Sequence, residues 1–143
     1  MRKKHFFELI DKPAILNALK KNGWAITGCA PEFKNDLDIA LGATKLVGSF
    51  LKYLPDDLKR NRQIVLNSVK ASGISLEFAP QPLRDDFNIV LEAVTQNGWA
   101  LGLASERLRA DKKIIAAAIK QNPSSIKYAI TVKKTGKYKR IRR

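Results

Sequence analysis

Apolar residues recur along this chain with helical spacing, and the whole pattern returns every 25 residues. Written in lines of 25 from Asp11, the chain gives four full lines and a partial fifth, without gaps. Positions four, five, eight and nine of the line are mostly apolar, as in Ile89, Val90, Ala93 and Val94. This spacing places them on one helical face and lacks the alternation of a strand. Each line should therefore open with a helix of about eleven residues, and the small residue at position eight should let neighbouring helices approach closely.

Two further positions predict where this helix begins and ends. At the first position stand residues that cap helix N-termini by accepting hydrogen bonds from free amides: Asp11, Asp36, Asn61, Asp86 and Asp111. At the thirteenth position stand four glycines and a proline: Gly23, Gly48, Gly73, Gly98 and Pro123. Glycine there is typical of the left-handed residue that ends a helix. A shorter second helix and a capped loop should complete each unit.

A single unit of this kind cannot bury its apolar face, whereas stacked units share a continuous core. The sequence predicts an all-α fold, an α-solenoid of tandem 25-residue helix-turn-helix repeats with basic termini. The expected segments are a basic lead-in at 1–10, repeats at 11–35, 36–60, 61–85, 86–110 and 111–130, and a basic C-terminal arm at 131–143. Gly42 lies within the second repeat's helix and should cost about 1 kcal/mol relative to alanine, so the least stable joint is expected there.

Residues 86–109 give the clearest form of the repeat, DFNIVLEAVTQNGWALGLASERLR. The line resembles the family called domain of unknown function 4116, whose units run from an aspartate through Ile-Val-Leu-x-Ala-Val and Gln-Asn-Gly to Ser-Glu-x-Leu-Arg. Residues 61–84 and 111–122 resemble it well, and 36–60 departs at LGAT and LVGS. The resemblance covers about 11–130. It implies a helical-repeat fold, no activity and no catalytic residue.

The net charge is +14, and half of it lies on the last 13 residues, which contain no acidic residue. Neutralising phosphates with such an arm releases counterions, which favours nucleic-acid binding, and a base can stack on its tyrosine. The candidate nucleic-acid-binding residues are Lys133, Lys134, Lys137, Tyr138, Lys139, Arg140, Arg142 and Arg143. The alternative is a solvated tail or a targeting stretch. Whether residues 128–143 form a hairpin around Thr135 and Gly136 or a loose arm stays open.

Cations also recur at two fixed positions of the repeat. The tenth position carries Lys20, Lys45, Lys70 and Lys120, interrupted by Thr95. The twenty-fourth position carries Lys34, Lys59, Arg84 and Arg109. A charge repeated at one phase forms a stripe that can follow a phosphate backbone. Local roles are the alternative, because a lysine in a last helical turn favours the helix dipole and a cation near the aspartate caps neutralises them.

Few residues suit catalysis or metal binding. Cys29 and His5 are the only cysteine and histidine, too few for a zinc site. The acidic pairs 56–57 and 85–86 lie at capped loops without a neighbouring histidine or phosphate-binding loop. We expect no enzymatic activity, no bound metal and no cofactor. Trp24 and Trp99 share one phase, where packing against a neighbouring helix is expected over base stacking.

The cysteine content and the hydropathy of the chain bear on its cellular compartment. A lone cysteine forms no internal disulfide, so a reducing compartment, cytoplasm or nucleus, is expected, with a short organelle presequence left open. No apolar run approaches the roughly 20 residues that cross a bilayer, and neither end has a basic amphipathic helix. No membrane partner is therefore expected.

These observations favour a non-enzymatic helical-repeat protein that docks on RNA, another polyanion or an RNA–protein particle such as a ribosome or virion, through its basic C-terminal arm. The alternative is a protein–protein adaptor that uses the concave repeat face, with basic ends for solubility or targeting. Rising salt should weaken binding to a polyanion steeply, and it should weaken binding to a protein partner only a little.

Overall fold

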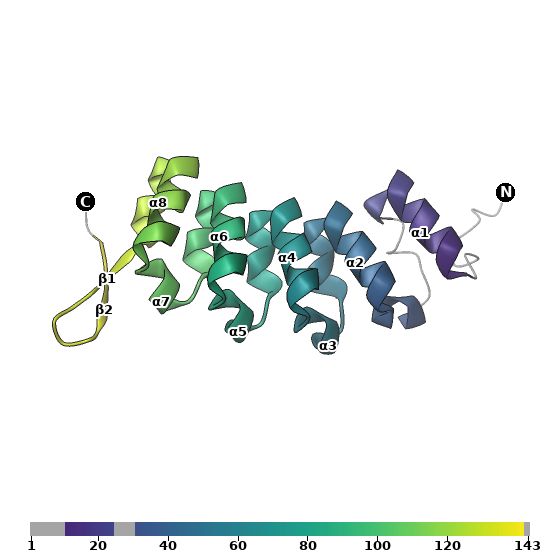
Figure 1. Ribbon diagram of the computed structural model, residues 1–143, viewed down its shortest axis with the longest axis horizontal. Coiled ribbons are helices and arrows are strands. Elements are labelled where there is room, and N and C mark those ends of the chain that lie inside the picture. The colour runs from purple at the N-terminus through teal and green to yellow at the C-terminus, as the bar shows by residue number, and fades with distance from the viewer. Residues whose placement is uncertain (1–10, 25–30, 142–143) are drawn as a thin grey trace.

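The computed structural model describes residues 11–24 and 31–141. Its helical repeats stack one after another from the N-terminal end to a small C-terminal hairpin (Figure 1). The predicted all-α solenoid is confirmed, since the described elements are helices apart from this one hairpin.

The long helices form the first row of the stack. They span ten residues each: α1 (Lys12–Lys21), α2 (Leu37–Leu46), α4 (Arg62–Ala71), α6 (Phe87–Gln96) and α8 (Lys112–Gln121). The predicted capping residue precedes every one of them, and its side chain accepts a hydrogen bond of 2.8–3.1 Å from the amide three residues on. Consecutive long helices lie side by side, as Figure 1 shows.

A second row consists of 3₁₀ helices, which take the place of the expected short second helix. They are η4 (Gly48–Tyr53), η5 (Gly73–Phe78), η6 (Gly98–Leu103) and η7 (Pro123–Tyr128). The linking segments, expected to be capped loops, contain further short helices: η3 (Pro31–Asn35), α3 (Asp56–Lys59), α5 (Gln81–Arg84) and α7 (Glu106–Arg109). The second, third and fourth repeats are thus each a long α-helix, a 3₁₀ helix and one short helical turn.

The repeated glycine does not adopt the left-handed conformation that the sequence predicted. Among the described residues the one positive φ belongs to Gly136, at 77°. The long helix instead ends on an extended residue such as Asn97, with φ −150° and ψ 109°, and Gly98 begins the 3₁₀ helix. A Cβ atom on Gly98 would lie 2.5 Å from the carbonyl oxygen of Ala118 in the next repeat. Glycine is therefore required because the neighbouring long helix passes too close for any side chain.

The core follows the predicted positions. The isoleucines at position four, such as Ile64 and Ile89, and the small residues at position eight, such as Ser68 and Ala93, are fully buried. Leucines of the 3₁₀ row, including Leu76, are buried between the rows. The continuous core therefore forms between neighbouring repeats, as expected for a solenoid.

Polar contacts also join one repeat to the next. The side-chain oxygen of Gln121 accepts a 2.6 Å hydrogen bond from the amide of Gly98, and Gln96 accepts one from Gly73. Ala71 occupies the same position in the third repeat and offers no such acceptor. The joint between the second and third repeats therefore lacks this bond.

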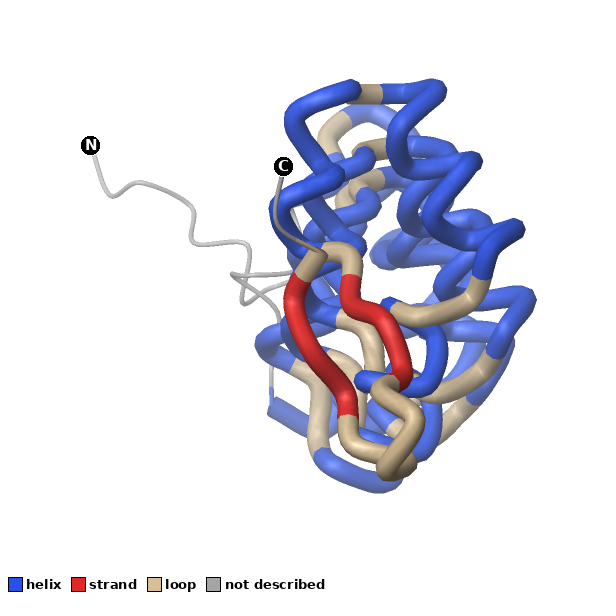
Figure 2. Tube along the Cα trace, turned by 90° about the vertical axis from the view of Figure 1, so that its left-hand side faces the viewer, coloured by secondary structure: helices blue, strands red, loops and turns tan. Residues whose placement is uncertain are grey.

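The basic arm forms a β-hairpin, which settles the choice that the sequence left open. Strands β1 (Ile130–Val132) and β2 (Tyr138–Arg140) pair antiparallel, and the turn between them contains Gly136. Ile130 is buried, and the amide of Ile141 donates a 3.0 Å hydrogen bond to the carbonyl of Ala129. Figure 2 shows the hairpin at the end of the stack. These contacts attach the basic segment to the last repeat.

Candidate nucleic-acid interface

The hairpin presents its cations to solvent. Its basic side chains that the structure describes are all exposed: Lys133, Lys134, Lys137, Lys139 and Arg140. Within the described part of the chain, none of the five forms an ion pair with a carboxylate. Arg142 and Arg143 lie outside the described residues. The hairpin therefore carries a dense positive charge that no acidic side chain of the described repeats neutralises.

The strand register divides these side chains between the two faces of the hairpin. Val132 lies opposite Tyr138 on one face, and Thr131 lies opposite Lys139 on the other. Because alternate residues of a strand share a face, Arg140 lies on the side of Tyr138. Tyr138 is 38% exposed, so its ring is available for stacking beside a guanidinium group.

At the base of the hairpin the positive charges of two guanidinium groups, Arg109 and Arg140, act on each other. Arg109, at the end of α7, donates a 2.9 Å hydrogen bond from Nε to the carbonyl oxygen of Tyr128. Burial lowers the pKa of Arg109, and the positive charge of Arg140 lowers this pKa further, while Glu106 acts in the opposite direction. A phosphate placed here would relieve the repulsion between the two guanidinium groups.

An open pocket of about 390 Å³ lies between the last two 3₁₀ helices and the chain that follows β2. We call it the Trp99 pocket, and its lining residues are Trp99, Ser124, Ile126, Lys127 and Ile141. The Nζ of Lys127 lies 4.3 Å from the centroid of the Trp99 ring, and the Tyr128 ring meets Trp99 edge-on at 5.6 Å. Trp99 thus packs against the next repeat, as the sequence suggested, yet it stays 38% exposed. Sequence reasoning missed this pocket because Ile141 reaches it only through the fold of the hairpin.

The two basic stripes differ in accessibility. Position-ten lysines are exposed in the last turns of their helices: Lys20, Lys45, Lys70 and Lys120. Position-twenty-four cations are half-buried: Lys34, Lys59, Arg84 and Arg109. Arg109 uses its Nε to bond the following repeat, and the Nε of Arg84 is buried. The position-ten lysines are therefore accessible to a ligand in solution. The burial of the position-twenty-four cations instead favours a structural role within and between repeats.

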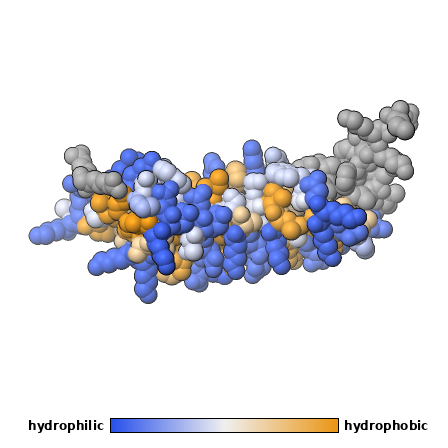
Figure 3. Space-filling model, turned by 90° about the horizontal axis from the view of Figure 1, so that it is seen from above, coloured by the Kyte–Doolittle hydropathy of each residue, from blue (hydrophilic) through white to orange (hydrophobic). Residues whose placement is uncertain are grey.

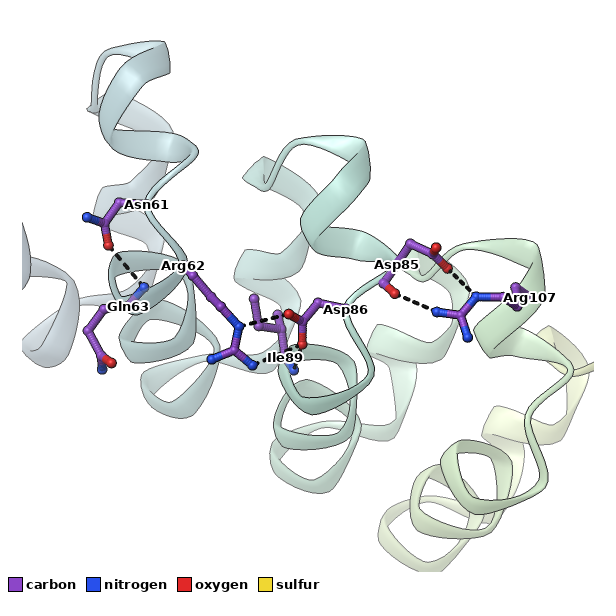
Figure 4. Close-up of polar contacts among 7 residues, drawn as sticks. All are labelled: Asn61, Arg62, Gln63, Asp85, Asp86, Ile89 and Arg107. Atoms are coloured by element: carbon purple, nitrogen blue, oxygen red, sulfur yellow. Dashed lines mark hydrogen bonds and ion pairs between the residues drawn. The ribbon is translucent and has the colours of Figure 1, made fainter.

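The acidic pair 85–86 connects neighbouring repeats (Figure 4). Asp85 accepts hydrogen bonds from Ser105 and from Nε of Arg107, the latter at 3.0 Å. Asp86 caps α6 and binds Nε of Arg62 at 2.8 Å. The hydrogen bond from Ser105 is the largest cause that lowers the pKa of Asp85, and the bond from Arg62 is the largest that lowers the pKa of Asp86. Both carboxyls therefore stay ionised at neutral pH and serve as joints between repeats.

The described residues contain no cluster of three or more metal-ligating side chains. Cys29 and His5 lie outside the described residues. No helix in 11–24 or 31–141 has the length and apolar character needed to cross a bilayer.

Comparison with known proteins supports the sequence resemblance. The sequence profile of the domain of unknown function DUF4116 matches three times in tandem, at residues 11–59, 43–84 and 86–131. No curated protein and no solved structure matches the chain significantly. The three matches together span nearly all of the helical stack and stop where the hairpin begins. This chain is therefore a member of the DUF4116 repeat family.

Proposed function

We propose that this protein is a non-enzymatic helical-repeat binding protein whose basic hairpin docks on RNA, free or within an RNA–protein particle. The observation that carries the proposal is the exposed hairpin, with five cations that no carboxylate of the described residues pairs. Each phosphate that these cations neutralise releases counterions, which is the main source of non-specific affinity for nucleic acids. The solenoid holds the hairpin at one end of the helical stack.

Single-stranded RNA is the expected form of the ligand. Tyr138 is exposed beside Arg140 on one face of the hairpin, and unpaired bases stack on aromatic rings and guanidinium planes. Bases inside a duplex are already stacked, so they do not reach such a ring.

Two variants with equal charge test the role of the hairpin. The first carries Lys133→Gln, Lys134→Gln, Lys137→Gln and Lys139→Gln, and its control carries Lys21→Gln, Lys52→Gln, Lys112→Gln and Lys113→Gln, which are exposed lysines outside both basic stripes. Affinity for a labelled single-stranded RNA is measured across a salt series. The plot of log affinity against log salt should lose about 3 units of slope in the hairpin variant, roughly 0.7 for each lost charge, and little in the control. An equal loss in both variants would show that overall charge, not the hairpin, drives binding.

A protein partner on the repeat surface is the second candidate. Leu46 and Ile74 are both 50% exposed, and Leu37 and Tyr53 are nearly as open. Viewed from above, apolar patches interrupt the hydrophilic surface of the stack (Figure 3). A partner held by these patches should stay bound as salt rises, which distinguishes it from RNA held by the hairpin.

A further inference from the structure

The Trp99 pocket exists because the solenoid ends there. Leu51, Leu76 and Leu101 are fully buried in the 3₁₀ row, each followed by another repeat. Ile126 stands at the same phase in the last repeat and is only half-buried. Ile141, from the chain after β2, lines the pocket with it. An apolar floor thus stays open beside the hairpin.

The wall of the pocket combines an aromatic ring with a positive charge. Lys127 Nζ lies 4.3 Å from the Trp99 ring centroid and 5.1 Å from that of Tyr128. Ser124 adds a hydroxyl group to the lining, and the lining contains no acidic residue. Proteins that hold single strands use the same two groups, an aromatic ring for the base and a cation for its phosphate. The volume of about 390 Å³ lies within the range of small-ligand pockets, roughly 300–1,000 Å³.

The pocket continues directly from the basic hairpin. Ile141 follows Arg140 in the chain, and Arg140 lies near enough to Arg109 for their charges to interact. The last cation of β2 and a lining residue of the pocket are thus adjacent in the chain. The negative charge of an RNA strand complements the hairpin cations and Lys127 of the pocket.

We infer that the Trp99 pocket holds one unpaired nucleobase of the RNA strand that the hairpin binds. The inference rests on the proposed function, because the hairpin supplies the phosphate contacts that bring the strand to the pocket. The base occupies the space between Trp99 and the two isoleucines, and the ammonium group of Lys127 contacts an adjacent phosphate.

Trp24 provides a matched control within the same chain. It stands at the phase of Trp99, three repeats earlier, and Lys52 and Tyr53 stand at the phases of Lys127 and Tyr128. Trp24 belongs to the first repeat, at the opposite end of the stack from the hairpin. The two tryptophans thus share their phase in the repeat and differ in their distance from the basic hairpin.

The experiment compares a ten-nucleotide oligouridylate with an abasic ribose-phosphate chain of equal length. Both carry the same phosphates, so the hairpin should bind both. The test uses a Tyr138→Leu background, which removes the stacking ring of the hairpin. In this background the full-length protein should bind the oligouridylate about 5- to 100-fold more tightly, which is the usual contribution of one stacked base. Adding Trp99→Leu should lower this affinity to that of the abasic chain, and adding Trp24→Leu should keep the difference. Circular dichroism and thermal unfolding verify that both variants are folded.

The outcomes separate this inference from the proposed function. Equal binding of both ligands by the wild-type protein, at a salt slope that depends on the hairpin, would retain RNA docking and overturn the base pocket. In the Tyr138→Leu background, a preference for oligouridylate that survives in Trp99→Leu, or that Trp24→Leu loses equally, would also overturn it. Failure to bind either ligand would reject the proposed function itself.

Discussion

A Cβ atom on Gly73 would lie 2.3 Å from the carbonyl oxygen of Ala93, and one on Gly48 would lie equally close to that of Ser68. Both oxygens belong to the backbone of a neighbouring long helix, so neither can move aside without shifting that helix. Gly42 differs, because a Cβ there would meet only Leu16 and Leu19 side-chain atoms, at 3.6 and 4.0 Å. Glycine is thus required for close packing at position thirteen of the repeat, whereas at Gly42 the structure leaves room for a side chain.

Replacing these glycines by alanine should therefore change stability in opposite directions. Gly73→Ala should lower the free energy of unfolding by about 1–3 kcal/mol, because the added methyl group overpacks a rigid contact. Gly42→Ala should raise it by about 0.5–1 kcal/mol, because alanine is the better helix former and finds room. Urea unfolding followed by circular dichroism measures both values. A Gly73→Ala protein as stable as the wild type would contradict the close approach.

At the scale of the element, the last turns of α6 and α8 join these two helices to the repeat before each of them. Gln96 and Gln121 accept hydrogen bonds from the glycine amide that begins the preceding 3₁₀ helix. The equivalent residue of α4 is Ala71, opposite the buried Gly48. The joints of the last three repeats therefore have a polar contact that the joint before them lacks.

Exchanging these side chains tests the contribution of the contact. Gln121→Ala should lower the free energy of unfolding by about 1–2 kcal/mol, because the Gly98 amide loses its acceptor. Ala71→Gln should raise it by about 0.5–1.5 kcal/mol by adding the missing bond. Gln63→Ala is the control, since Gln63 is exposed and its side chain bonds only Asn67 within α4. If Gln121→Ala behaved like this control, the inter-repeat bond would have no measurable effect.

At the scale of the whole molecule, each repeat packs mainly on its immediate neighbours, so local differences are not averaged over the chain. Gly42 weakens α2, and the joint between α2 and α4 lacks the glutamine contact. The C-terminal half has both glutamine contacts and ends in the attached hairpin. Among the second to fifth repeats, unfolding should therefore begin in the second.

Native-state hydrogen exchange checks this order. The glycine and the missing bond together should lower the opening free energy of α2 by about 2 kcal/mol relative to α6, so α2 amides should exchange roughly thirtyfold faster. Gly42→Ala combined with Ala71→Gln should reduce the difference in exchange rate between α2 and α6. Uniform protection from α2 to α8 would instead indicate that the described repeats open as one cooperative unit.

The sequence by itself determined the repeat length, the long helices, their capping residues and the buried positions. These features depend on neighbours within one unit: a capping aspartate acts on amides two or three residues away, and helical spacing decides which side chains share a face. Their recurrence in each line made the stacked fold the only way to bury that face.

Tertiary structure decided the rest. The reason for the glycine at position thirteen, the 3₁₀ geometry of the second row, the attachment of the hairpin and the Trp99 pocket all depend on distances between different repeats. Trp99 and Ile141 line one pocket although 42 positions separate them in the chain. No local pattern encodes such a distance, because it is set by how closely two packed helices approach and by where the last repeat lacks a neighbour.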